Sequence, residues 1–263
     1  MFIENTENRR YFKSSLLEST GAVSHGFTTK LGGASCGKVE GLNLGFRVGD
    51  NSAAVRENYK TVARDLEMPY KAIVASRQTH STNIRVVTAD DMGKGVSRES
   101  DIFDTDALIT NCAQIPLVVF YADCVPILMF DTKKRAAAAI HSGWRGTADK
   151  IAEKTVRALA ENFGSQPEDI LAAVGPSIGP CCFECGAEVA ELFPDDIVSK
   201  NENGKFKVNL WQNIVRMFTD CGLRRENIEV FEQCTMCKSD IFYSYRKHKE
   251  KTGRMGAFIM IKG

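Results

Sequence analysis

This sequence has almost no excess of either charge, because its 263 residues carry 34 Lys and Arg against 33 Asp and Glu. A net charge of +1 provides neither a basic surface for nucleic acid nor the acidic tail of a disordered chain. Its longest apolar runs are interrupted within about a dozen residues, short of the ~20 needed to cross a bilayer. We therefore expect no nucleic acid and no membrane among its partners.

The amino terminus, MFIENTENRR, has no apolar segment of the kind that directs secretion. We accordingly expect a cytoplasmic protein, acting as a monomer on small molecules. Nine cysteines are an odd number, and without a secretion signal they are expected to be thiols or metal ligands. A disulfide framework is not expected.

The chain length suits a single catalytic domain over residues 1–263, since no linker, repeat or low-complexity segment divides it. Glycines crowd residues 26–50, which predicts tight turns and close approach of the backbone to a ligand. Apolar periodicity predicts helices at 52–66, 148–163, 187–193 and 209–221, with Asp50 or Ser52 capping the first and Asn209 the last. Strands are predicted at 72–76, 84–88, 106–110, 117–130, 136–140, 171–174 and 257–261. This irregular mixture favours an α+β, or mixed α/β, fold.

A thiol and two imidazoles stand out at predicted strand ends or inside predicted strands. Cys124 follows Asp123 inside the otherwise apolar run 116–131, His141 follows the strand 136–140, and His80 precedes another strand. These three residues provide what a three-ligand zinc site requires, with the fourth position left for water. Spacings of 44 and 17 residues are no local finger motif, so the fold must bring the ligands together. Taken singly, a buried cysteine is more often inert core and a histidine a satisfied polar residue.

Several residues are candidates for binding an anionic or polar substrate. Arg145 lies in GWRG just before the helix predicted from residue 148, with Thr147 as its cap, and a helix start of this kind binds phosphate. Arg47, Arg246 and Asn43 are further candidates for phosphate, ribose or base. The alternative for each arginine is an ordinary salt bridge.

Two other interpretations of the cysteines remain open. Cys124 would be the nucleophile of a cysteine hydrolase if His80 or His141 served as its base, although a bound metal would suppress that chemistry. Cys182-x2-Cys185 and Cys234-x2-Cys237 superficially form a four-thiolate zinc site, but they lie much further apart than in a zinc ribbon. We favour buried thiols packed near the pocket for these two pairs.

An ordered series of motifs covers nearly the whole chain. Besides His80, it comprises GFTTKLGG at 26–33, LNLG at 42–45, VGD at 48–50, DALIT at 106–110, ADC at 122–124, HSGWRG at 141–146, GPSIGPCC at 175–182, CTMC at 234–237, FYSYR at 242–246 and TGRM at 252–255. On these motifs the chain resembles the bacterial laccase-domain, or multicopper polyphenol oxidase, family, whose members are also regarded as purine nucleoside phosphorylases. Ser142, Cys185, Asn209 and Lys247 depart from residues common in that family.

The resemblance implies a layered α/β/β/α fold and Zn(II) bound by His80, Cys124 and His141. It also implies phosphorolysis of adenosine, inosine, guanosine and 5'-methylthioadenosine, and deamination of adenosine. Asp123 is the carboxylate nearest to the ligands and a candidate proton donor. Because adjacent residues of a strand point to opposite faces, Asp123 is alternatively expected to orient a ligand.

The histidine count argues against a full multicopper centre. A blue-copper site alone takes two histidines and a cysteine, and a trinuclear cluster would need several more imidazoles. The chain has four histidines in all. Phenol oxidation with a single Cu(II) is the remaining copper alternative.

Overall fold

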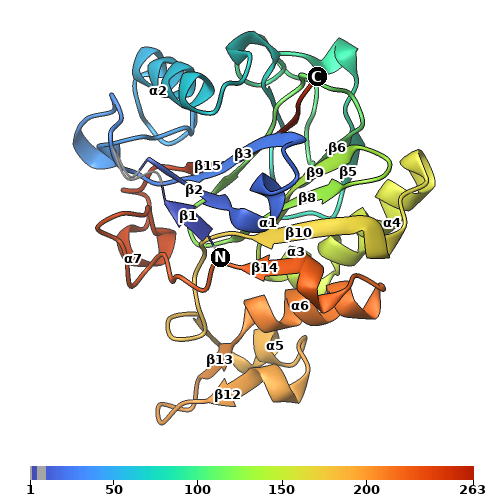
Figure 1. The fold of residues 1–263 in the computed structure, drawn as a ribbon. Helices are drawn as coiled ribbons and strands as arrows, with labels where there is room; N and C mark the ends of the chain where they lie inside the picture. The colour runs from blue at the N-terminus through green and yellow to red at the C-terminus, as the bar shows by residue number, and fades with distance from the viewer. Residues whose placement is uncertain (1, 5–9) are drawn as a thin grey trace.

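The structure, a computed structural model, describes residues 2–4 and 10–263, and two large mixed sheets form its centre (Figure 1). The first sheet has the spatial order β1 (Phe2–Glu4), β2 (Tyr11–Ser14), β3 (Val23–Thr28), β15 (Met255–Ile261), β7 (Leu117–Tyr121) and β4 (Val74–Ala75). The second sheet has the order β14 (Ile228–Val230), β10 (Ile170–Val174), β8 (Val125–Asp131), β9 (Ala136–Ser142), β6 (Ala107–Thr110) and β5 (Ile84–Val86). A third, small sheet of β11 (Glu184–Cys185), β13 (Phe206–Val208) and β12 (Val198–Lys200) projects from one end.

The two large sheets pack face to face over a shared core. Phe27, Val119 and Ile259 of the first sheet meet Leu128 and Ala139 of the second there. Both large sheets are covered on their outer faces as well, and for this reason central strands such as β8 and β9 are buried along their whole length.

Helices complete the outer layers. The helix α2 (Ser52–Asp65) packs Val55, Tyr59 and Val62 over the first sheet, and α4 (Ile151–Phe163) and α6 (Leu210–Asp220) cover the second. The short helices are α1 (Ser15–Glu18), α3 (Trp144–Ala148), α5 (Ala187–Ala190) and α7 (Tyr245–His248). The expected α/β/β/α layering with mixed sheets is therefore confirmed.

Three local expectations are wrong. The helix α2 is capped by Asn51, whose side chain accepts from the Ala53 N–H, and not by Asp50 or Ser52. The helix predicted at 148–163 begins only at Ile151, as α4, because Lys150 has a positive φ of 62°, and Ala148 is the end of a separate short helix, α3. The strand predicted at 117–130 is two strands, β7 and β8, which belong to different sheets.

The bend between β7 and β8 occupies residues 122–124. Asp123 has a φ of 94°, and its carboxylate accepts hydrogen bonds from Thr235 Oγ1 at 2.7 Å and from the Arg246 N–H at 2.5 Å. These contacts hold a conformation that an apolar sequence pattern gives no reason to expect. The bend carries the chain from the first sheet to the second.

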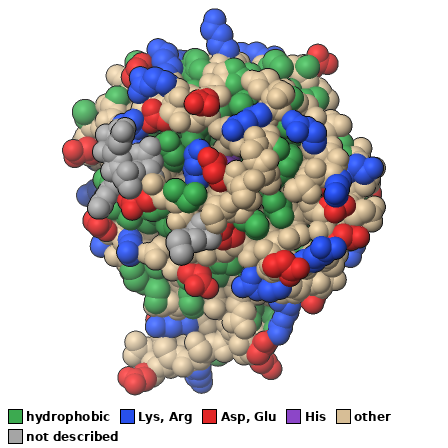
Figure 2. All heavy atoms as spheres, viewed as in Figure 1, with side chains coloured by type: hydrophobic (Ala, Val, Ile, Leu, Met, Phe, Trp, Pro, Cys, Tyr) green, Lys and Arg blue, Asp and Glu red, His purple; other side chains and the backbone are tan. Residues whose placement is uncertain are grey.

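The surface matches the balanced composition. Basic and acidic side chains are intermingled over the face in Figure 2, without a field of one sign. Within residues 2–4 and 10–263, no helix has both the length and the apolar character that a membrane span requires.

Candidate metal centre

His80, Cys124 and His141 meet at one end of the second sheet, although they come from three separate segments. Cys124 ends the bend before β8, and His141 lies in β9, where it pairs with Pro126 of β8. His80 lies in the loop between β4 and β5, with a φ of 66°. Two of the three residues thus lie on connections that cross from one sheet to the other.

The three side chains are close enough to share one ion. Cys124 Sγ lies 3.7 Å from His80 Nε2, and the two imidazole centroids are 5.0 Å apart. One ligand atom from each residue lies within 4.8 Å of the others. His141 is buried, whereas His80 is exposed and marks the open side of the group. The predicted convergence of these residues therefore occurs, and they form a possible metal site.

Asp106 orients the ring of His141 and holds the backbone at His80. This fully buried carboxylate lies 2.7 Å from His141 Nδ1 and accepts the backbone N–H of His80 at 3.1 Å. It also accepts the N–H groups of Thr79 at 3.0 Å and Ser81 at 2.9 Å. Carboxylates hydrogen-bonded in this way fix the tautomer and direction of metal-binding imidazoles.

Sequence reasoning missed the role of Asp106. No local pattern relates residue 106 to residues 80 and 141, which become neighbours only because β6 pairs with β5 on one side and β9 on the other. The available signals were the DALIT motif at 106–110 and the placement of a carboxylate at the start of a predicted buried strand.

The three side chains and Asp106 also polarise one another. Burial opposes ionisation of Cys124, but His141 and, more weakly, His80 outweigh it and lower the pKa of the thiol to about 6. Burial likewise disfavours the imidazolium, but Cys124 and Asp106 raise the pKa of His141 to about 9. The sulfur therefore has the thiolate character that both metal binding and nucleophilic attack require.

The absence of a side chain at Gly143 leaves space for His80 and Cys124 to pack closely. A Cβ atom there would lie 2.7 Å from His80 Cδ2 and 3.2 Å from Cys124 Sγ. Any larger residue would push the imidazole or the sulfur away. The glycine of HSGWRG thus serves the close packing of the ligands.

The centre opens into a cavity of about 1330 Å³. Eight Arg or Lys side chains line this cavity, whereas Glu99 and Asp123 are the two carboxylates in its lining. Arg47, Arg145 and Arg246, which were predicted to bind substrate, are among these eight. Arg254 is another and was not predicted.

Asn43, which was predicted to bind substrate, instead bonds to neighbouring protein groups. Asn43 is buried outside the cavity lining, and its amide bonds to the backbone of Gly45 and Arg254 and to the Asp50 carboxylate. It therefore shapes the loop that carries Gly45 into the cavity wall.

Arg145 lies inside α3 and not before a helix, because α3 begins at Trp144. Its guanidinium carbon lies 4.2 Å from the centre of the Trp144 ring. Thr147 donates to the Gly143 carbonyl and does not cap a helix start, so that expectation is wrong.

Two packed sheets with a His-Cys-His group at the point where the chain crosses between them define a laccase-domain protein. The chain belongs to the family described as multi-copper polyphenol oxidoreductase laccase, whose model matches residues 24–262.

Relatives of known name and structure cover most of the chain. It is 34% identical over 247 residues to purine nucleoside phosphorylase YlmD of Bacillus subtilis, covering 91% of this chain and 89% of that protein. It is 33% identical to adenosine deaminase RL5 from an unknown prokaryotic organism, covering 81% and 84% of the two chains. The crystal structure of YlmD from Geobacillus stearothermophilus superposes with a TM-score of 0.92 at 30% identity, covering 100% and 99%.

Proposed function

We propose that this protein is a zinc-dependent purine nucleoside enzyme. It would cleave adenosine, inosine, guanosine and 5'-methylthioadenosine with phosphate and deaminate adenosine. The observation that carries this proposal is the convergence of His80, Cys124 and His141, oriented by Asp106, at the end of a cationic cavity. The names of the relatives agree with it, since they include both a purine nucleoside phosphorylase and an adenosine deaminase.

The donor set suits zinc. Imidazole nitrogen and thiolate sulfur are both ordinary zinc ligands, and three protein ligands keep one position for water or substrate. When bound, zinc would polarise a water molecule or a substrate atom at the cavity end. His80, Cys124 and His141 would hold the ion, and Asp106 would keep the His141 ring directed at it and the loop of His80 in place.

The other histidines do not add to this centre. His25 lies in β3, where its Nε2 accepts the Ser14 N–H, and His248 lies in α7. Among the described residues, the possible metal site therefore contains two histidines, and a multicopper cluster is not assembled within one copy of the chain. A single Cu(II) at the same three ligands is the lesser alternative.

The cavity suits both halves of a nucleoside-and-phosphate substrate pair. An excess of six basic side chains, eight against two acidic ones, would neutralise phosphate, for which the guanidinium fork is well shaped. Phe46, Trp144 and Tyr245 also line the cavity and provide faces on which a purine would stack. We assign phosphate to Arg145, Arg246 and Arg47, in keeping with their place on the wall.

Asp123 has a positioning role in this proposal. Both of its oxygens already accept hydrogen bonds, from Thr235 and from the Arg246 N–H. It thereby fixes the bend that presents Cys124 and the start of the helix that presents Arg246. Its expected role in orienting a ligand fits these contacts better than that of a proton donor.

Metal analysis combined with chromatography of the products tests the proposal. Wild-type protein with adenosine and phosphate should yield adenine, ribose 1-phosphate and inosine. Cys124→Ala should lose the zinc of this centre and reduce turnover by more than the ~10–100-fold typical of outer-shell changes. Cys112→Ser, in a half-buried cysteine away from the centre, is the matched control and should change neither quantity. Full turnover by metal-free protein would refute the proposal.

A cysteine hydrolase is the second candidate, and one observation favours it. Cys124, His141 and Asp106 form a line of nucleophile, base and orienting carboxylate, and the thiol pKa is lowered to about 6. Stoichiometric zinc in the active protein would exclude this candidate. Activity that persists after zinc removal and disappears on alkylation of Cys124 would favour it.

A further inference from the structure

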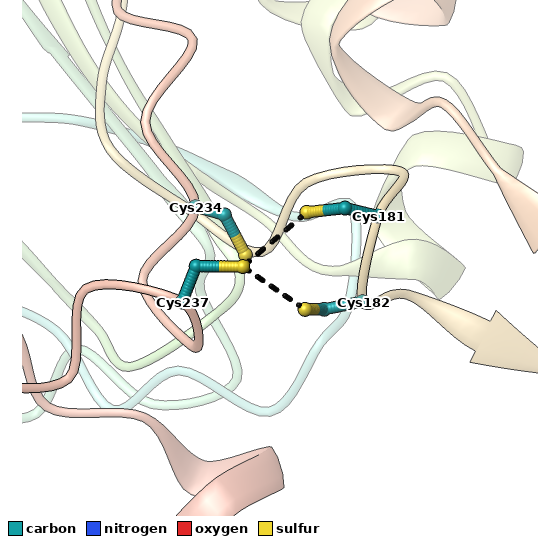
Figure 3. Close-up of side chains that lie close together, drawn as sticks. All are labelled: Cys181, Cys182, Cys234 and Cys237. Carbon is teal, nitrogen blue, oxygen red and sulfur yellow. Dashed lines mark hydrogen bonds between the residues drawn. The ribbon is translucent and has the colours of Figure 1, made fainter.

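Four cysteines outside the cavity lining form a second cluster. Cys181 and Cys182 lie in the connection between β10 and β11, and Cys234 and Cys237 lie in the segment after β14. Figure 3 shows their side chains directed toward a common point from the two segments. All four sulfurs lie within 4.8 Å of one another. Cys237 Sγ is 3.4 Å from Cys182 Sγ and 3.6 Å from Cys181 Sγ.

The spacing of the sulfurs matches a tetrahedral ion and not a disulfide. A disulfide joins sulfurs at about 2.05 Å, well below either of these two separations. Four thiolates around zinc at about 2.3 Å place their sulfurs roughly 3.8 Å apart at the corners of a tetrahedron. The observed separations differ from that figure by only a few tenths of an ångström.

We propose that Cys181, Cys182, Cys234 and Cys237 bind a structural Zn(II) ion. Four thiolates complete the tetrahedral coordination of zinc, so no position remains for substrate. The site is therefore chemically distinct from the three-ligand centre, and it does not depend on the function proposed for that centre.

The ligand set differs from the pairing that the C-x2-C spacing suggested. The favoured expectation of buried thiols is also wrong, because Cys237 is exposed and Cys182 is half-buried. Cys185 was paired with Cys182, but it lies in β11, where it pairs with Phe206, outside the cluster. Cys181 takes its place because the N–H groups of Cys182 and Phe183 both bond to the Gly179 carbonyl. This tight turn brings two adjacent cysteines to one point.

The segment that carries Cys234 and Cys237 also forms a turn. The Lys238 N–H bonds to the Cys234 carbonyl at 3.0 Å, which curls the segment and brings Cys237 beside Cys234. The two segments are also joined to each other, because Ser177 pairs with Cys234 and the Thr235 N–H bonds to the Ser177 carbonyl. Both halves of the cluster are thus held together by backbone contacts as well.

The cluster lies behind one wall of the cavity. Ile178 and Phe183, on either side of Cys181 and Cys182, line the cavity. The Ile178 N–H bonds to the Asp123 carbonyl, and Thr235 Oγ1 bonds to the Asp123 carboxylate. A metal joining the two cysteine segments would stabilise the wall and the bend that presents Cys124.

Metal counting and thiol footprinting of the full chain test this site directly. Zinc-loaded wild-type protein should contain two zinc ions per chain, and Cys124→Ala should contain one. In mass-spectrometric alkylation, Cys181 and Cys237 should be protected although both are exposed, and they should react after removal of zinc by a chelator. Cys36, exposed and outside both groups, should react in either state. Cobalt(II) should give the visible absorption of a tetrahedral thiolate complex in the Cys124→Ala protein.

Single substitutions identify the ligands. Cys237→Ser should lose one zinc ion and lower the Tm by more than about 5 °C. Cys185→Ser, the neighbouring half-buried cysteine outside the cluster, should keep both ions. Alkylation of Cys181 and Cys237 in zinc-loaded wild-type protein would overturn the proposal, as would a disulfide between Cys182 and Cys237 in place of bound metal. These wild-type readouts decide the matter even if Cys237→Ser does not fold.

Discussion

The protein holds two groups of side chains whose spacing suits a metal ion, and the two groups differ in nearly every respect. The His80–Cys124–His141 group has two ring nitrogens and one sulfur, opens into a cavity and is oriented by a buried carboxylate. The four-cysteine cluster has sulfur alone, lies behind the cavity wall and is shaped by backbone turns. If both groups bind zinc as proposed, a reactive centre differs from a supporting one by an incomplete ligand set and by side chains that direct it.

The three-ligand group is packed closely against the backbone at Gly143. A substitution at this position should have the largest effect on activity. Gly143→Ala places a methyl group 2.7 Å from His80 and 3.2 Å from Cys124, so one ligand must move. We expect nucleoside turnover to fall by more than ~100-fold, as for loss of an essential ligand contact. The zinc of the four-cysteine cluster should remain. Enzyme assays and metal counting measure both effects.

The neighbouring glycine is a matched control for this substitution. In Gly146→Ala, within the short helix that Gly143 precedes, the added carbon would meet its nearest atoms at 3.5 Å, an ordinary contact. Its activity and zinc content should stay close to those of wild type. Equal activity of the two variants would mean that the close packing around Gly143 does not matter.

The orienting carboxylate should have the next largest effect. Asp106→Asn removes the negative charge that faces the His141 ring. It also replaces one of the two oxygens that accept the three backbone N–H groups by an amide nitrogen, which cannot accept. We expect zinc affinity at the three-ligand centre to fall about 10–100-fold. Competition with a calibrated chelator measures this affinity, with the four-cysteine zinc as an internal reference.

Asp91→Asn provides the control, since Asp91 is equally buried and accepts from Arg85, Lys94 and a backbone N–H. It should lower stability without weakening zinc binding. If both variants bound zinc alike, Asp106 would be a structural residue only.

A third histidine, His25, shows the effect of burial outside the two groups. It is fully buried in β3, and burial lowers its pKa to about 4, while Lys13 opposes and Glu18 and Glu229 favour its charged form. The unfolded chain, with a histidine pKa near 6.5, binds the extra proton between about pH 6.5 and 4. Stability is therefore complete above pH 6.5 and is lost as the pH falls through that window.

His25→Asn should flatten this part of the stability profile and leave the pocket unaffected. The asparagine oxygen can still accept the Ser14 N–H that His25 Nε2 accepts at 2.9 Å. Between pH 8 and pH 5 the wild type should lose about 2 kcal/mol more unfolding free energy than the variant, from the pKa difference. Denaturant unfolding at the two pH values measures it. Identical slopes would show that His25 is not the titrating group.

The parts of the structure that follow from local sequence were predictable. The helix α6 begins after its predicted cap Asn209, and β10 and β15 lie within a residue or two of their expected bounds. These elements are set by capping and by apolar periodicity, which act over a few residues.

Features that depend on tertiary contacts were not predictable. His80, Cys124 and His141 were identified as residue types, but Asp106 joins them only through strand pairing across β5, β6 and β9. Cys181 replaced Cys185 because of a turn around Gly179. The division of residues 117–130 likewise depends on Thr235 and Arg246, more than a hundred residues away.

The bend at 122–124 has a consequence for how this chain can change over evolution. Cys124 follows within three residues of the end of a strand in one layer and directly precedes a strand in the other, whereas His141 belongs to the second layer alone. A substitution that changes side-chain volume between the two layers, for example at Val119 or Ala139, would shift the Cys124 sulfur relative to the His141 imidazole without contacting either. Selection for chemistry would then act on interior packing far from any substrate.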